Sequence, residues 1–115
     1  MSGLAPGEAV DAAALPLAHE ALPAVEVIIG APTAAVHELT TVGGVEVGIW
    51  EMTPGTASDT EVDEVFVVLS GRARIEFVEP ALPAIEVAAG SVVRLAAGQR
   101  TVWTVTETLR KIYIA

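Results

Sequence analysis

From Val25 to the end of the chain, short apolar segments alternate with turn residues. The clearest pattern is "RARIEFV", in which Ala73, Ile75 and Phe77 alternate with charged residues. A period of two predicts a strand with one buried face. Further β-forming segments lie at 25–30, 34–42, 45–53, 65–71, 85–90, 91–98 and 101–115. Short strands that are separated by glycine and proline, without a long helical pattern, predict an all-β sandwich or barrel.

The residues of two connections between these segments predict their structure. Gly43-Gly44 separates two β-forming segments and predicts a tight hairpin, because such turns need positive φ. After Pro54-Gly55 the chain becomes acidic, with Asp59, Glu61 and Asp63. We interpret this run as a solvated loop, since it lacks the glycine and the ligand spacing of a calcium loop.

The first 24 residues differ from the rest. They are rich in alanine and carry prolines at 6, 16 and 23. We expect a flexible or loosely docked extension at 1–24, followed by a single domain at 25–115. The N-terminus lacks the basic start and continuous apolar stretch of a signal peptide, and no apolar run is long enough for a membrane helix. These features predict a cytoplasmic protein.

Composition excludes several classes of function. The chain has 115 residues, 52% of them hydrophobic, and no cysteine, so disulfides and thiolate metal sites are excluded. The net charge of −9 argues against nucleic acid and anionic membrane surfaces as partners. It does not argue against a small-molecule ligand, since a pocket can differ in charge from the rest of the protein.

Several motifs resemble those of the cupins. Glu64 and Gly71 match the second half of the first cupin motif, and Gly90 and Gly98 match the glycines of the second. The segments "GIWEMTPG" (48–55), "WTVTE" (103–107) and "RKIYI" (110–114) resemble a small-cupin subfamily that includes the ethanolamine-utilisation cupins and is similar to ureidoglycine aminohydrolases. The resemblance implies a jelly-roll β-barrel, a cupin-type fold, with a pocket at one mouth.

Three of the four metal ligands of that family are missing here, and only the glutamate, Glu64, is retained. The resemblance places its first two histidines on Ser58 and Thr60 or on Ala57 and Asp59, and its third on Thr101. A lone carboxylate does not hold a transition metal tightly. We therefore expect neither a metal nor another cofactor. The alternative is a metal site rearranged around His37, Glu51 and Glu64; His37 is otherwise a surface or strand-pairing residue.

Glu64 is the candidate catalytic residue. If it points inward as in the family, alternation also turns Val62, Phe66 and Val68 inward. A carboxyl group among apolar side chains without a cation can act as a general acid or base, because desolvation penalises its charged form. The alternative is a position at the barrel rim, solvated or paired with Arg94 or Lys111.

The remaining candidates would shape a ligand pocket. Thr101, Trp103 and Val105 share one face of their strand. Trp50 and Glu51 are adjacent and face opposite ways, so only one can enter the barrel, and Trp50 alternatively packs in the core. Tyr113 shares a face with Lys111, and the two either reach the pocket or cap the sheet edge. The candidate ligand-binding residues are Trp103, Thr101, Arg94, Trp50, Glu51, Phe66 and Tyr113.

Three functions follow from these residues. The first is a metal-free cupin that binds an unidentified small molecule, with lyase or isomerase chemistry at Glu64. The second is a degenerate cupin that serves as a structural or dimerisation module, for which segment 34–42 offers an unpaired edge. The third is the rearranged metal cupin. As a partner we expect a second copy of the chain, in a homodimer.

Overall fold

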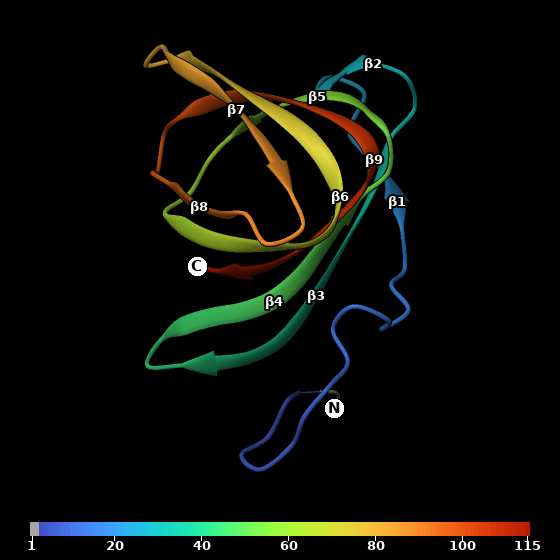
Figure 1. Cartoon of the computed structure of the whole chain (residues 1–115), viewed down its shortest axis with the longest axis vertical. Coiled ribbons are helices and arrows are strands. Elements are labelled where there is room, and N and C mark those ends of the chain that lie inside the picture. Colours follow the sequence, from blue (N-terminus) through green and yellow to red (C-terminus); the bar gives the residue numbers. More distant parts are fainter. Residues whose placement is uncertain (1–2) are drawn as a thin grey trace.

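The computed structural model describes residues 3–115 and contains a curved, antiparallel β-barrel, as the resemblance implies (Figure 1). No helix within these residues is long and apolar enough to cross a membrane. The strands are β1 (Glu20–Ala21), β2 (Val27–Ile29), β3 (Thr33–Val42), β4 (Val45–Met52), β5 (Gly55–Thr60), β6 (Glu64–Glu79), β7 (Leu82–Ala88), β8 (Val92–Leu95) and β9 (Arg100–Ile114). The predicted all-β fold is confirmed.

The two longest strands, β6 and β9, form the centre of the barrel. They pair antiparallel from Val65↔Ile114 to Glu79↔Arg100. On its other side β9 pairs with β5 through residues 100–105 and with β4 through residues 109–114. Figure 1 shows the result: the paired strands curve, so that β5, β6, β7, β8 and β9 surround one interior, and the β3–β4 hairpin extends below them.

Most irregularities of the β6–β9 pairing lie next to Gly71. The β6–β9 register shifts on both sides of Ser70, and β9 changes partner from β5 to β4 in the same region. Gly71 has φ +93°, and a Cβ at this position would collide with the carbonyl oxygen of Thr108. Only glycine combines this backbone conformation with so close an approach of two strands.

The core lies inside the curve, as the alternation in the sequence requires. Ala73 and Ile75 are buried while Arg72, Arg74 and Glu76 are exposed. Side chains that are almost fully buried include Phe66, Ile75, Leu95, Leu109 and Val68. The core is continuous from β6 through β9 to β4, which fixes the inward face of each strand.

The structure corrects two strand boundaries. The Gly43-Gly44 hairpin is confirmed, with Val42 opposite Val45. The segments 65–71 and 72–78 form one bent strand, because Gly71 turns the chain without ending the ladder. The predicted acidic loop begins with a strand, β5, whose Gly, Ala and Asp residues are weak strand formers. It pairs with β9 and with β2, and this pairing overrides the local preference.

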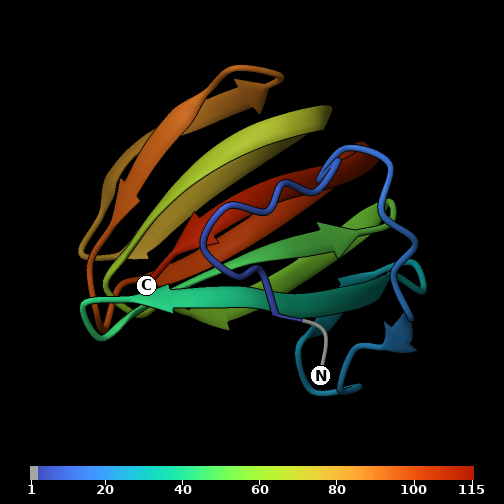
Figure 2. The ribbon, with the colours of Figure 1, turned by 90° about the horizontal axis from the view of Figure 1, so that it is seen from below.

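The N-terminal segment lies across the face of the sheet formed by β3, β4 and β9, as Figure 2 shows. The Leu4 amide donates to the carbonyl of Leu39 at 2.6 Å, and β1 pairs with Thr33 and Ala34 of β3. The described part of the predicted extension therefore makes specific contacts with the barrel. The domain boundary after residue 24 stays a prediction, and residues 1–2 lie outside the described residues.

Substitution of Gly71 by alanine is expected to destabilise the fold more than the same change at Gly90. Both glycines have φ +93°, but a Cβ at Gly90 meets nothing within 4 Å. Gly90→Ala should cost about 1–2 kcal/mol, the usual penalty of a left-handed conformation. Gly71→Ala adds the collision with Thr108. Urea unfolding of both variants measures the difference, and equal losses would contradict a role for Gly71 in strand approach.

Candidate functional site

A cavity of about 400 Å³ opens at one mouth of the barrel. Its size is typical of a small-molecule site. Strands β4, β5 and β9 supply its walls, together with the chain that enters β6. The lining residues are Leu22, Glu26, Val36, Glu46, Trp50, Met52, Ala57, Ser58, Asp59, Glu61, Val62, Glu64, Trp103, Lys111, Tyr113 and Ala115.

An ion pair lies at the inner end of the cavity. Lys111 Nζ donates to Glu64 Oε2 at 2.7 Å, and the two side chains are 6% and 9% exposed. The ammonium group also lies 4.2–5.0 Å from the ring centroids of Trp50, Phe66 and Trp103. These distances permit cation–π attraction, which is strongest where water is excluded. The rings and the carboxylate together hold one buried positive charge.

A second carboxylate, Glu61, is buried beside Trp103. Its Oε2 accepts hydrogen bonds from Thr101 Oγ1 at 2.6 Å and from Trp103 Nε1 at 2.9 Å. The residue is only 7% exposed. The prediction of a solvated acidic loop is therefore wrong for Glu61, because β5 carries the chain inward at this point. Glu61 and Thr101 thus fix the orientation of the Trp103 ring, which forms a wall of the cavity.

Tyr113 forms another part of the cavity wall. Its hydroxyl donates to Glu46, and burial together with this carboxylate raises the pKa of Tyr113 well above its usual range. Gly48 lies opposite Tyr113 in the β4–β9 register, and a Cβ there would lie 2.5 Å from the tyrosine ring. The absence of a side chain at Gly48 thus provides the space in which Tyr113 lies.

The cavity is negatively charged. Among the described lining residues, Lys111 is the only lysine or arginine, and it is paired with Glu64. The other acids are Glu26, Glu46, Asp59 and Glu61. Asp59 lies at the mouth; partial burial of its carboxyl group, with repulsion from Glu61, raises its pKa to about 6. The field in the cavity therefore favours cationic or neutral groups.

The structure brings some predicted site residues together and separates others. Trp50, Trp103, Tyr113 and Glu64 line the cavity. Phe66 is fully buried behind Lys111, and Thr101 acts on the cavity through Glu61 and Trp103.

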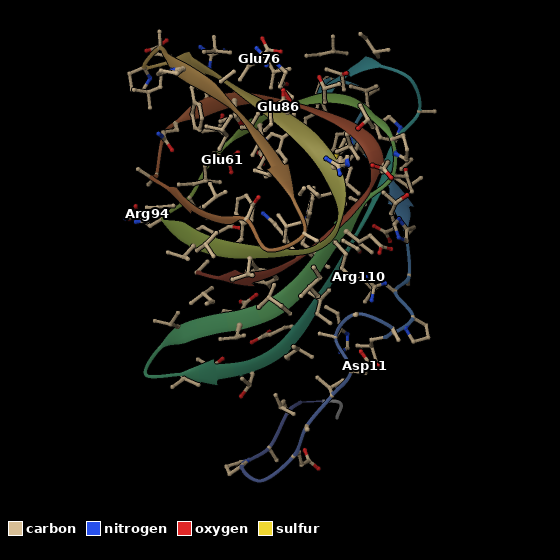
Figure 3. All side chains as sticks on the ribbon, viewed as in Figure 1. Asp11, Glu61, Glu76, Glu86, Arg94 and Arg110 are labelled. Carbon is tan, nitrogen blue, oxygen red and sulfur yellow. The ribbon has the colours of Figure 1, made fainter. Side chains whose placement is uncertain are left out.

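Arg94 and Glu51 do not line the cavity. Arg94 is 61% exposed and pairs with Asp63 at 3.4 Å, while Lys111 takes the place beside Glu64. The view of Glu64 as a carboxylate without a cation is therefore wrong, and the alternative pairing with Lys111 is observed. Figure 3 shows Arg94 at the margin of the molecule and Glu61 inside the ring of strands.

Glu51 instead organises the opposite face of β4. It accepts from Arg110 Nε at 2.7 Å and lies 2.7 Å from His19 Nε2. Burial alone would raise the pKa of Glu51, but these hydrogen bonds hold it below its usual value. Arg110 also donates to the carbonyls of Ala12 and Leu15 at 2.9 and 2.7 Å, which ties the N-terminal segment to β9. The charged cluster is thus a docking contact for that segment.

The rearranged metal site is not formed. His37 faces the N-terminal segment, together with Leu39, whereas Glu64 faces the cavity on the other side of the sheet. Within residues 3–115, no group of three or more histidine, aspartate or glutamate side chains could hold a metal ion. The structure therefore does not support the interpretation of His37, Glu51 and Glu64 as ligands.

Comparison with protein families supports the cupin fold. The model of the EutQ-like cupin domain matches residues 39–113, which include β4, β6 and β9 and most of the cavity wall. The chain belongs to the EutQ-like cupin family. None of the curated proteins matches this cupin.

Solved structures share the cupin fold with this protein. A protein of unknown function of the DUF861 family from Pseudomonas syringae is 22% identical, with a TM-score of 0.74, over 89% of this chain and 45% of its own. The Clostridium difficile EutQ protein is 21% identical, with a TM-score of 0.61, over 72% and 67%. A DUF1255 protein of unknown function from Acidithiobacillus ferrooxidans is 26% identical, with a TM-score of 0.61, over 96% and 98%. This cupin thus spans less than half of the Pseudomonas protein.

Among the cavity residues that the sequence did not indicate as site residues are Glu46 and Glu61. Glu46 shares a face of β4 with Gly48 and Trp50, so alternation from Trp50 could have identified it. Glu61 had no such signal, because its burial follows from the pairing of β5 with β9 and its hydrogen bonds come from residues 40 and 42 positions away.

Removal of one member of the Glu64–Lys111 pair should destabilise the protein more than replacement of both. Glu64→Gln leaves a buried ammonium group without its counter-ion, which typically costs about 3–5 kcal/mol. The double variant Glu64→Leu, Lys111→Met removes both charges and should recover most of that loss. Urea unfolding of the two single variants and the double variant measures this coupling. Additive losses would contradict it.

The stability of the protein should depend on Asp59 at mildly acidic pH. Its pKa is raised from 3.8 to about 6, so the folded state binds a proton more tightly than the unfolded chain does. The resulting stabilisation is complete below pH 3.8 and is lost as the pH rises through about 6. In Asp59→Asn this part of the pH dependence should disappear from thermal unfolding curves. An unchanged difference between the two proteins across this interval would contradict the shift.

Proposed function

We propose that this cupin binds a small organic molecule, neutral or cationic, in the cavity at the barrel mouth, without a metal. The observation that carries the proposal is the cavity itself, with tryptophan walls and a buried Lys111–Glu64 pair at its inner end. A barrel filled by its own side chains would favour a purely structural role. Here Met52 and Trp103 pack in the core and also contribute to the cavity wall, which supports a binding function.

The charges of the lining support a ligand class. A carboxylate or phosphate ligand would meet Glu26, Glu46 and Asp59, while the Lys111 ammonium is already neutralised by Glu64. Burial of a second anion without a free cation is costly. Neutral molecules with hydroxyl or carbonyl groups avoid this cost. Cationic amines are attracted by the acidic side chains of the lining. The tryptophan rings offer flat apolar surface to either.

Glu64 and Lys111 would supply the chemistry, if the bound molecule reacts. They are 2.7 Å apart, within the range for proton transfer, and both line the cavity. Together they can take a proton from one atom of a ligand and return it to another, as lyase and isomerase reactions require. The pair replaces the unpaired Glu64 that the sequence suggested.

A second candidate function is self-association as a homodimer through β3. Within residues 3–115, Thr33 and Ala34 of this ten-residue strand pair with β1, and further along the strand the Leu39 carbonyl accepts from the Leu4 amide. Beyond them, Val36 and Val42 are 64% and 68% exposed. An edge strand with unpaired backbone groups and apolar side chains is a template for pairing with another chain. This favours an antiparallel β3–β3 contact between two copies.

A thermal-shift panel tests the binding function. Neutral polyols, aldehydes and amines should raise the unfolding temperature, and dicarboxylates and divalent metals should not. A ligand at a hundred times its dissociation constant stabilises the folded state by about 2.7 kcal/mol. Trp50→Ala should abolish the shift, while Arg94→Ala, outside the cavity, should keep it. A panel without any shift, combined with a dimer in light scattering, would favour the second function instead.

A further inference from the structure

Lys111 is the single lysine of the sequence. The other basic residues are arginines, at positions 72, 74, 94, 100 and 110. Surface lysines usually serve solubility, but this one is 6% exposed and lines the cavity. Arginine cannot be deprotonated in proteins, whereas a lysine amine can lose its proton and act as a nucleophile. The only primary amine among the side chains is therefore placed at the inner end of the proposed ligand site.

The contacts of the Lys111 amine leave it able to react with a bound ligand. In the described part of the chain its hydrogen-bond partner is Glu64, at 2.7 Å. An ammonium group has three donors, and the remaining approach is towards aromatic rings rather than further acceptors. A lysine that served only to neutralise buried charge would be expected to contact several acceptors. Here one carboxylate holds the group and could also accept its proton.

We propose that Lys111 Nζ forms an imine with the carbonyl group of a neutral aldehyde or ketone bound in the cavity. The inference deepens the proposed function and rests on it, because it names a class of ligand for the same cavity. A neutral carbonyl compound carries no negative charge, so Glu46 and Asp59 do not repel it as they would an anion. It also places an electrophilic carbon where the only side-chain amine lies.

The reaction balances with groups that are present. The Lys111 ammonium gives one proton to Glu64, and the free amine adds to the carbonyl carbon. A proton moves from nitrogen to the carbonyl oxygen, which gives a neutral carbinolamine. The proton on Glu64 then passes to the hydroxyl group, the carbon–oxygen bond breaks, and water leaves. The product is an iminium cation beside a Glu64 carboxylate, with no oxidant or reductant required.

The surroundings suit the product as well as the resting amine. The iminium group keeps the positive charge of the ammonium, so it remains attracted by Glu64 and by the rings of Trp50, Phe66 and Trp103. Its formation therefore requires no new buried charge. Since Glu64 is within hydrogen-bond distance of the reacting nitrogen, proton transfer to and from it needs no rearrangement.

Reductive trapping tests the proposal on the wild-type chain. The protein is incubated with glycolaldehyde and cyanoborohydride, which reduces imines to stable amines, and modification is followed by intact mass and peptide mapping. The chain offers two amines, Lys111 and its own N-terminus. We expect Lys111 to react about 100-fold faster in the native protein than in urea, the scale of a positioned proton transfer. A native rate no greater than the unfolded rate would overturn the proposal.

Variants assign the acceleration to the site. Glu64→Gln keeps Lys111 but removes the proton acceptor, so the native rate should fall to that of the unfolded chain. Arg94→Ala, away from the cavity, should react as the wild type does. Should Glu64→Gln fail to fold, the comparison of native and unfolded wild type still decides.

Ethylene glycol separates the inference from the binding function. It resembles glycolaldehyde without a carbonyl group, so a thermal shift with it reports binding alone. A thermal shift without trapping would overturn the imine and leave the binding function intact. The absence of both the shift and the trapping would count against the imine and against the binding function.

Discussion

The long antiparallel pairing of β6 with β9 is the constraint on which the rest of the structure depends. Because β9 pairs with β4 and β5 in succession on its other edge, every wall of the cavity is placed relative to this pair. This pair bends, with register shifts next to Gly71, so that its two halves lie around one interior. Without the bend the same residues would form a flatter sheet, and Glu64 and Trp103 would not face the same cavity.

A buried ion pair stands where the resemblance to metal-binding cupins leads one to expect a metal ligand. The motif resemblance assigns Glu64 to the position of the family's glutamate, and Lys111 supplies the positive charge next to it. The three aromatic rings around the ammonium lower the cost of its burial. A lysine differs from a metal ion in a chemically important way, since it can exchange a proton and form a covalent bond.

The two faces of β4 and β9 have separate roles. On the inner face Trp50, Lys111 and Tyr113 line the cavity. On the outer face their neighbours Glu51 and Arg110 hold the N-terminal segment through His19 and the carbonyls of Ala12 and Leu15. Figure 3 shows Arg110 directed towards that segment, near Asp11. Because alternate residues of a strand point to opposite faces, a shift of one residue in register would exchange the two roles.

The sequence by itself determined the fold class, the Gly43-Gly44 hairpin and the inward faces of the strands around Ile75 and Trp103. These features follow from local rules, namely a period of two, turn chemistry and motif spacing. Only the tertiary structure decided that Glu64 pairs with Lys111 rather than Arg94, that Glu61 is buried and that Glu51 leaves the cavity. Each of these depends on which strands are neighbours and in which register, and such long-range pairing has no signature within a single segment.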